Sequence, residues 1–177
     1  VVIIISALSF YEFNSLIVRI LKNTFLKFLS SGVILLYLFL FVSIIFWIET
    51  TKVENLNYKL FLFYAIVVSI GSDLGGYIFG NIFKGKKLTK ISPNKTISGV
   101  IGAFVFSMLI IPIFYNDLKF ININLLFFAT IIISIISQLG DLFISFLKRL
   151  AKVKDTGNIL PGHGGILDRI DGMLFAA

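Results

Sequence analysis

The chain has 177 residues, of which 58% are hydrophobic and 14% are charged, and it contains no cysteine. A water-soluble domain averages about 45–50% apolar and about 25% charged residues, so a soluble globular protein is excluded and the bilayer must solvate much of the surface. The lack of cysteine excludes disulfides, thiolate metal sites and cysteine nucleophiles. The net charge is +7, and the lysine and arginine residues lie between apolar stretches. This placement favours anionic lipid head groups or a phosphorylated substrate, rather than nucleic acid, as the binding partner.

The apolar runs predict an all-α, polytopic transmembrane helical bundle. Four runs have the length of about 17–25 residues that a bilayer crossing requires: 32–48, 60–83, 97–115 and 123–147. Helices are expected because the strands of a membrane barrel are shorter and alternate polar with apolar residues. Residues 1–13 resemble the end of an earlier span and residues 164–177 the start of a later one. We therefore expect a fragment, one membrane domain over 1–177, with incomplete N- and C-terminal spans.

Basic residues alternate between the two sides of the predicted bundle. Twelve lie in the first, third and fifth loops, and three lie in the loops between them. The positive-inside rule places the lysine-rich loops in the cytoplasm. The two polar loops of interest, 84–96 and 148–165, fall on this same face, which is in contact with nucleotides.

Two carboxylates lie inside predicted spans. Asp73 is in the middle of the second long run, and Asp141 is near the end of the fourth. A carboxylate in a transmembrane helix costs roughly a few kcal/mol unless it is paired or faces water, so a functional role is the default hypothesis. For Asp73, a structural role capping a broken helix stays open. Asp141 follows Ser137 and Gln138 by one turn, and the three form a polar stripe leading into the basic loop.

Polar and charged residues gather near the end of the chain in the segment KDTGNILPGHGGILDRID, residues 154–171. Asp168 and Asp171 are three residues apart and share a helical face, and carboxylate oxygens suit Mg²⁺. Basic side chains suited to phosphate are Lys148, Arg149, Lys152 and Lys154. The glycines around His163 leave amides free to point at an anion ahead of a helix. Each feature alone has a structural explanation, such as a solvated helix start or a surface histidine. Their coincidence favours phosphate and metal chemistry.

The stretch SFLKRLAKVKDTGNILPGHGGILDRID, residues 145–171, resembles the C-terminal signature of the phosphatidate cytidylyltransferases (CDP-diacylglycerol synthases), S-x-x-K-R-x-x-x-x-K-D-x-G-x-x-x-P-x-H-G-G-x-x-D-R-x-D. All thirteen specified positions match. Upstream, SQLGDLF is similar to a family segment with a metal-binding aspartate, which would be Asp141. SDLGGYIFG and ISPNKT are similar to the family motifs SDxxAYxxG and SPxKT. The chain departs from the family at Gly76, where alanine is common, and at Ile97-Ser98, where Trp-Glu is usual.

The resemblance implies an enzyme of phospholipid biosynthesis that converts CTP and phosphatidate into CDP-diacylglycerol and diphosphate. Asp141 and Asp168 would be ligands of Mg²⁺, with Asp171 supporting them and a second cation left open. The residues implied in catalysis are Asp141, Asp168, Asp171, Lys148, Arg149 and His163, the last only in positioning. The residues implied in substrate binding are Ser92, Lys95, Thr96, Lys154, Asp155, Arg169 and Asp73.

The expected partners are CTP, phosphatidate and membrane lipids, with no nucleic acid, and the glycine spacing is compatible with a homodimer. The expected location is the bacterial inner (cell) membrane, with the active site facing the cytoplasm. Alternatives are another CTP-using membrane lipid kinase or nucleotidyltransferase, a cation transporter, and an inactive structural membrane protein. A transporter would explain Asp73 and Asp141 but not the Gly-His-Gly-Gly loop or the basic clusters.

Overall fold

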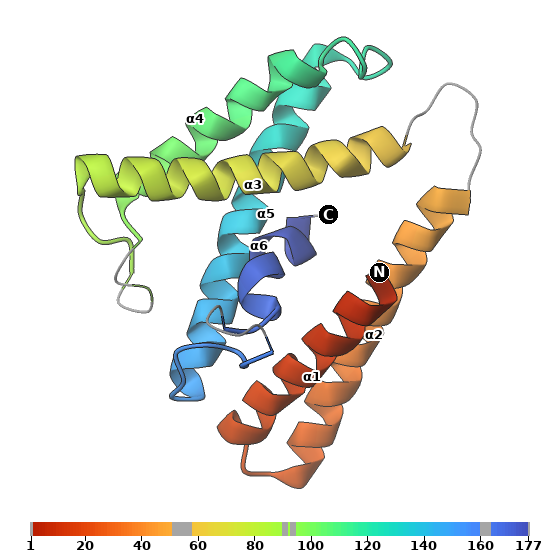
Figure 1. Cartoon of the computed structure of the whole chain (residues 1–177), viewed down its shortest axis with the longest axis vertical. Helices are drawn as coiled ribbons and strands as arrows, with labels where there is room; N and C mark the ends of the chain where they lie inside the picture. Colours follow the sequence, from red (N-terminus) through yellow and green to blue (C-terminus); the bar gives the residue numbers. More distant parts are fainter. Residues whose placement is uncertain (1, 51–57, 90–91, 93–94, 160–163, 177) are drawn as a thin grey trace. The chain divides into compact units, whose positions relative to one another are not determined.

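The computed structural model describes residues 2–50, 58–89, 92, 95–159 and 164–176. Within these residues the chain forms six α-helices: α1 (Val2–Ile20), α2 (Thr24–Thr50), α3 (Tyr58–Phe83), α4 (Ile97–Phe114), α5 (Ile123–Leu150) and α6 (Leu167–Ala176) (Figure 1). The first five are long and apolar enough to cross a membrane. The predicted all-α transmembrane fold is therefore confirmed, and the chain has the helices of an integral membrane protein.

The helices extend beyond the apolar runs at their polar ends. Helix α1 reaches Ile20, α2 starts at Thr24, and α5 continues to Leu150, so Lys148 and Arg149 lie in its last turn rather than in a loop. A hydropathy run ends at the first charges, whereas lysine and arginine are good helix formers and interact favourably with the negative end of the helix dipole.

The chain divides into two compact units. The first combines Val1–Lys52 with Ile144–Ile170, and the second combines Val53–Phe143 with Asp171–Ala177. Helices α5 and α6 each begin in one unit and end in the other. Each unit contains some of the polar residues that the sequence predicted for the site.

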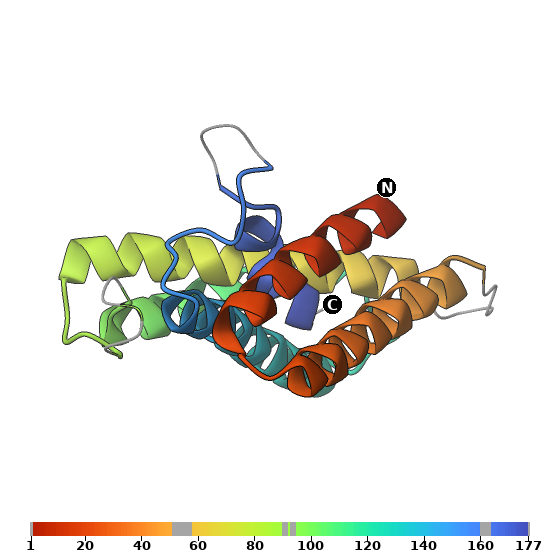
Figure 2. The same ribbon diagram turned by 90° about the horizontal axis from the view of Figure 1, so that it is seen from below.

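In the first unit, α1 and α2 form a helical hairpin that turns at residues 21–23 (Figures 1 and 2). Asn23 caps α2, because its side chain accepts a hydrogen bond from the Phe25 amide at 2.8 Å. The Ser31 hydroxyl donates to the Asn14 side chain at 2.7 Å and links the two helices. One face of α1 is buried, at helical spacing: Ser6, Ser9, Glu12, Phe13 and Leu16.

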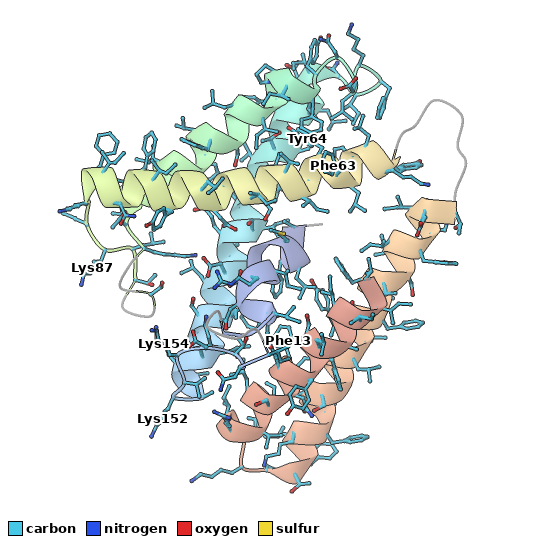
Figure 3. All side chains as sticks on the ribbon, viewed as in Figure 1. Phe13, Phe63, Tyr64, Lys87, Lys152 and Lys154 are labelled. Carbon is cyan, nitrogen blue, oxygen red and sulfur yellow. The ribbon has the colours of Figure 1, made fainter. Side chains whose placement is uncertain are left out.

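In the second unit, polar side chains connect α3 to α5. Three pairs of hydroxyl groups lie within hydrogen-bond distance: Tyr64 and Thr130, Ser69 and Ser137, and Ser72 and Ser134. Figure 3 shows Tyr64 among the side chains of this unit, where it packs edge-on against Phe114. Hydrogen bonds of this kind join helices within a bilayer, where hydrophobic burial between helices contributes little.

Helices α3 and α4 approach each other through glycines, and both views show them running side by side (Figures 1 and 2). A Cβ atom added to Gly102 would lie within 3.0 Å of the Phe79 side chain and of the Gly75 carbonyl oxygen. A Cβ added to Gly75 would be equally close to Gly102. The expected small-residue packing of these helices is thus present at Gly75 and Gly102.

We expect Gly102→Ala to lower the free energy of unfolding by about 1–3 kcal/mol, because the added methyl group would force α3 and α4 apart. Gly32→Ala is the matched control, since a Cβ there meets nothing within 4 Å. Relief of the glycine entropy penalty should stabilise that variant by about 0.5–1 kcal/mol. Denaturation of both proteins in detergent, followed by circular dichroism, measures the difference. Equal stability of the two variants would contradict the close packing.

Candidate active site

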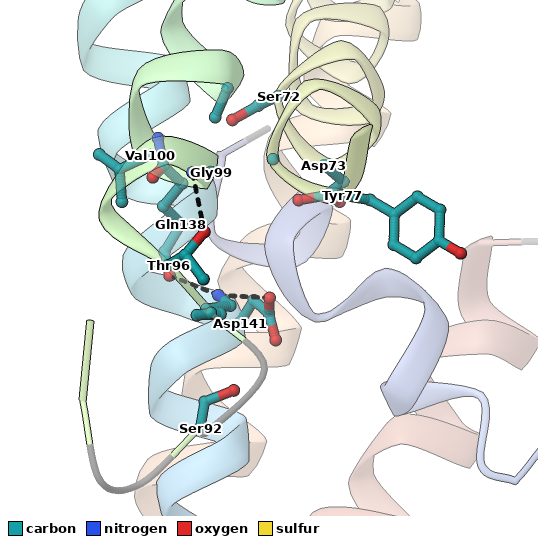
Figure 4. Close-up of a pocket in the computed structure, with 12 residues that line it drawn as sticks. Ser72, Asp73, Tyr77, Ser92, Thr96, Gly99, Val100, Gln138 and Asp141 are labelled. Carbon is teal, nitrogen blue, oxygen red and sulfur yellow. Dashed lines mark hydrogen bonds and ion pairs between the residues drawn. The ribbon is translucent and has the colours of Figure 1, made fainter. Parts of the chain in front are cut away.

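A pocket of about 280 Å³ lies in the second unit between α3, α4 and α5 (Figure 4). Its lining includes five residues that the sequence predicted for the site: Asp73, Ser92, Lys95, Thr96 and Asp141. Small residues on the two facing helices, Gly76, Gly99 and Ala103, leave the space that forms it. Helix α3 continues without a break through Asp73, so this residue does not cap a broken helix.

Lys95 and Asp141 form the charged centre of this pocket. The Lys95 Nζ lies 2.5 Å from an Asp141 carboxylate oxygen and 3.5 Å from the Gln138 carbonyl oxygen. In Figure 4 a dashed line at the Asp141 carboxylate marks this ion pair. Lys95 lies near the end of the loop between α3 and α4, whereas Asp141 lies on α5. Of the predicted polar stripe, the Asp141 side chain therefore meets a cation from the other polar loop, whereas Ser137 pairs with Ser69 and the Gln138 amide donates to Ser134.

Thr96 and Ser98 build the start of α4. Thr96 is the N-cap, and its side chain accepts a hydrogen bond from the Gly99 amide at 3.1 Å. The Ser98 hydroxyl lies 2.9 Å from the Thr96 hydroxyl and accepts from the Gly85 amide at 3.3 Å. Ser98, which stands where the resembled family has glutamate, thus joins both ends of the loop between α3 and α4.

In the first unit, Asp168 is held by both of its carboxylate oxygens. Lys148 Nζ donates to Oδ1 at 2.6 Å. The Oδ2 atom accepts from the Thr156 amide at 2.8 Å, the Thr156 hydroxyl at 3.0 Å and the Gly165 amide at 3.1 Å. Burial by itself raises the pKa of Asp168, but the hydrogen bonds from Lys148, Thr156 and Gly165 outweigh it and hold the pKa below its usual value. The hydrogen bonds therefore favour the ionised form of the Asp168 carboxylate.

The backbone amides ahead of α6 are occupied by protein carboxylates, which corrects the expectation that the Gly165 amide is free for a substrate anion. Gly165 donates to Asp168, and the Ile166 and Leu167 amides donate to Glu12 at 3.0 and 2.8 Å. The anion at this helix N-terminus is thus part of the protein. His163 lies outside the described residues, so its predicted positioning role stays a prediction.

Glu12 is the residue that the sequence reasoning missed. It lies on α1, is only 1% exposed, and accepts a further hydrogen bond from the Thr156 hydroxyl at 2.8 Å. Glu12 is the only acidic residue in the first twenty positions, inside an apolar stretch. The rule that singled out Asp73 and Asp141, that a carboxylate in a membrane helix is functional by default, would also have found it.

Asp171 lies on the part of α6 that belongs to the second unit. Its carboxylate accepts from the Gly172 amide at 2.9 Å, and the residue is buried. The adjacent Gly172 contacts α5 and α3 closely, because an added Cβ would lie 2.6 Å from the Ser137 hydroxyl and 3.5 Å from Asp73 Oδ2. The end of α6 is thereby held near the pocket residue Asp73.

The other predicted site residues are exposed: Arg149 on α5, Lys154 and Asp155 in the connection to α6, and Arg169 on α6. Figure 3 shows Lys152 and Lys154 extending from this connection. Among the described residues, no three His, Asp or Glu side chains gather to hold a metal ion. Mg²⁺ is commonly held by only one or two carboxylates together with substrate phosphates and water, so Asp141 and Asp168 are suitable donors without such a cluster.

Comparison with known proteins gives a consistent family assignment. A family model described as "Cytidylyltransferase family" matches residues 1–177. A Staphylococcus haemolyticus protein named phosphatidate cytidylyltransferase is 49% identical over 128 residues, covering 71% of this chain and 48% of the relative. Proteins of the same name from Staphylococcus saprophyticus and Staphylococcus aureus are 46% and 44% identical, covering 73% and 76% of this chain and 49% and 51% of themselves. The chain spans about half the length of these curated relatives. It belongs to the cytidylyltransferase family.

Proposed function

We propose that the protein containing this chain is a phosphatidate cytidylyltransferase, which converts CTP and phosphatidate into CDP-diacylglycerol and diphosphate. Family membership and the name shared by the bacterial relatives support this reaction. The single structural observation that carries it is a repeated pairing of aspartate with lysine. Lys95 pairs with Asp141 in one unit, and Lys148 pairs with Asp168 in the other.

Each pair contains the two groups that a nucleotide–metal substrate requires. The carboxylate can bind Mg²⁺, and the ammonium group can bind a phosphate oxygen. While the substrate is absent, the two groups neutralise each other. With a nucleotide–metal substrate bound, Asp141 and Asp168 would hold the cation, and Lys95 and Lys148 would hold phosphate oxygens, so that each charge would keep an opposite partner.

The proposed chemistry needs little covalent participation by the protein. A phosphate oxygen of phosphatidate attacks the α-phosphorus of CTP, the bond from that phosphorus to the bridging oxygen breaks, and diphosphate leaves. The attacking phosphate is already anionic, so no general base is required. Bound Mg²⁺ would neutralise phosphate charge. In the first unit, Lys148, Arg149 and Lys154 would offer cations to the triphosphate or the lipid phosphate. In the second unit, Lys95, Ser92 and Thr96 would offer an ammonium group and hydroxyl groups to a phosphate. Positioning and charge neutralisation supply most of the catalysis in such transfers.

The proposed site faces the cytoplasm of a bacterial cell membrane. The excess of basic residues in the loops that carry Lys95 and Lys154 supports this orientation, and the relatives from Staphylococcus support the bacterial origin. CTP reaches the enzyme from the cytoplasm, and phosphatidate reaches it from the bilayer. Assembly as a homodimer stays a prediction.

The test is the reaction itself, with the full-length protein in mixed micelles, radiolabelled CTP and phosphatidate. We expect labelled CDP-diacylglycerol that requires both the lipid and Mg²⁺ and disappears with excess EDTA. Diacylglycerol in place of phosphatidate tests the lipid-kinase alternative, which would yield phosphatidate instead. Ion flux into liposomes tests the transporter alternative. Folded protein that forms no CDP-diacylglycerol under these conditions would overturn the proposal.

A further inference from the structure

The buried carboxylate of Glu12 has no part in the proposed reaction, yet it makes three hydrogen bonds to the segment that carries Asp168. Its Oε1 atom accepts from the Ile166 amide, and its Oε2 atom accepts from the Leu167 amide and the Thr156 hydroxyl. Burial of an ionised carboxylate is unfavourable unless such partners compensate it. The N-terminus of α6 supplies both amides, together with the positive end of the helix dipole.

Thr156 connects Glu12 directly to Asp168. Its hydroxyl oxygen lies 2.8 Å from Glu12 Oε2 and 3.0 Å from Asp168 Oδ2, and its amide donates to the same Asp168 oxygen at 2.8 Å. A threonine hydroxyl has a single hydrogen, so only one of the two carboxylates can receive it fully at a time. Glu12 is therefore a second acceptor for the same hydroxyl that contacts Asp168.

Two glycines leave room for this carboxylate. A Cβ atom on Gly157 would lie 2.8 Å from Glu12 Oε1, and a Cβ on Gly165 would collide with both the Thr156 hydroxyl and Glu12. The backbone on either side of residues 158–164 thus closes around one side chain of α1. Gly165 also donates its amide to Asp168 Oδ2, so the same glycine contacts both carboxylates.

We propose that Glu12 is a positioning residue of the active site: it fixes Thr156 and the first turn of α6, and through them it orients the Asp168 carboxylate toward the cation. This inference rests on the proposed function, in which Asp168 is a ligand of Mg²⁺. A residue that orients a metal ligand acts on metal affinity, and loss of such a residue typically weakens metal binding or activity by about 10–100-fold.

The test is Glu12→Gln in the full-length protein, with Glu49→Gln as the matched control, because Glu49 is exposed on α2. Glutamine keeps the size of the side chain, but its amide nitrogen cannot accept the hydrogen bonds that one carboxylate oxygen receives. We expect the Mg²⁺ concentration for half-maximal activity to rise about tenfold or more in Glu12→Gln, with a smaller change in kcat at saturating Mg²⁺. Glu49→Gln should match the unaltered protein.

A second readout does not depend on turnover. Electron paramagnetic resonance titration of Mn²⁺ in the presence of CTP should show the same loss of affinity in Glu12→Gln. If Glu12→Gln does not fold, Thr156→Val and Thr156→Ser replace it, because only serine keeps the linking hydroxyl. Valine should weaken Mn²⁺ binding, whereas serine should preserve it.

Unchanged Mn²⁺ affinity and an unchanged Mg²⁺ requirement in folded Glu12→Gln would overturn the inference. Equal Mn²⁺ affinity in the two Thr156 variants would also overturn it. If the unaltered protein binds Mn²⁺ but forms no CDP-diacylglycerol, the proposed reaction fails. The inference about Glu12 would then still stand or fall on the Mn²⁺ titrations alone.

Discussion

Asp168→Ala is expected to reduce CDP-diacylglycerol formation by roughly 10²–10³-fold or more, which is the usual cost of removing one group that stabilises transition-state charge. The substitution removes the proposed ligand of Mg²⁺ and leaves the Lys148 ammonium group without its 2.6 Å partner. It also leaves the amides of Thr156 and Gly165 without their acceptor. Activity is measured as labelled product over a range of Mg²⁺ concentrations.

Two further variants separate this loss from misfolding. Asp117→Ala makes the same change at an exposed position in the turn after α4 and should leave activity intact. Asp168→Asn keeps the shape of the side chain but offers only one acceptor oxygen, so it cannot satisfy Lys148 and the two amides together. The Asp168→Asn variant is therefore expected to be nearly as inactive as Asp168→Ala. It should still elute as a folded protein in size-exclusion chromatography. Substantial activity in Asp168→Asn would argue against a metal-binding role.

The membrane helices were predictable because their signal is local. A run of apolar residues long enough to cross a bilayer must satisfy its own backbone hydrogen bonds, and a helix does this without distant partners. The sequence therefore identifies α3, α4 and α5 closely, whereas α2 starts at Thr24 rather than at the predicted residue 32. It places the ends less well, as at Arg149, because a hydropathy run ends at a charge and a helix does not.

The partners of the charged residues were not predictable, because the contacts join residues far apart in sequence. Lys95 meets Asp141 across 46 positions, and Glu12 meets Leu167 across 155. The glycines of the C-terminal motif likewise do not reveal their partners from the sequence alone. A glycine such as Gly165 indicates that something approaches the backbone closely, but not whether it is a ligand or another part of the chain. Here it is the Glu12 carboxylate.

Asp141→Asn and Lys95→Met are expected to impair the enzyme in different ways, although the two residues form one ion pair. Asp141→Asn removes a proposed Mg²⁺ ligand, so activity should fall by roughly 10²–10³-fold, and the remaining activity should need more Mg²⁺. Lys95→Met removes a proposed phosphate partner, so the KM for CTP should rise. Its Mg²⁺ requirement should stay unchanged or fall, because the lysine that competes for Asp141 is absent.

The direction in which each variant changes the Mg²⁺ requirement distinguishes a substrate-binding role of Lys95 and Asp141 from a purely structural ion pair. If the Lys95–Asp141 contact served only to hold the loop before α4 against α5, removing either partner would cause the same loss of stability and the same change in kinetics. Lys119→Met and Asp117→Asn, both at exposed positions after α4, are the matched controls. Opposite shifts in Mg²⁺ requirement for Asp141→Asn and Lys95→Met would show that the carboxylate serves the cation and the lysine serves the nucleotide. Parallel shifts would mean that the pair only links the loop before α4 to α5.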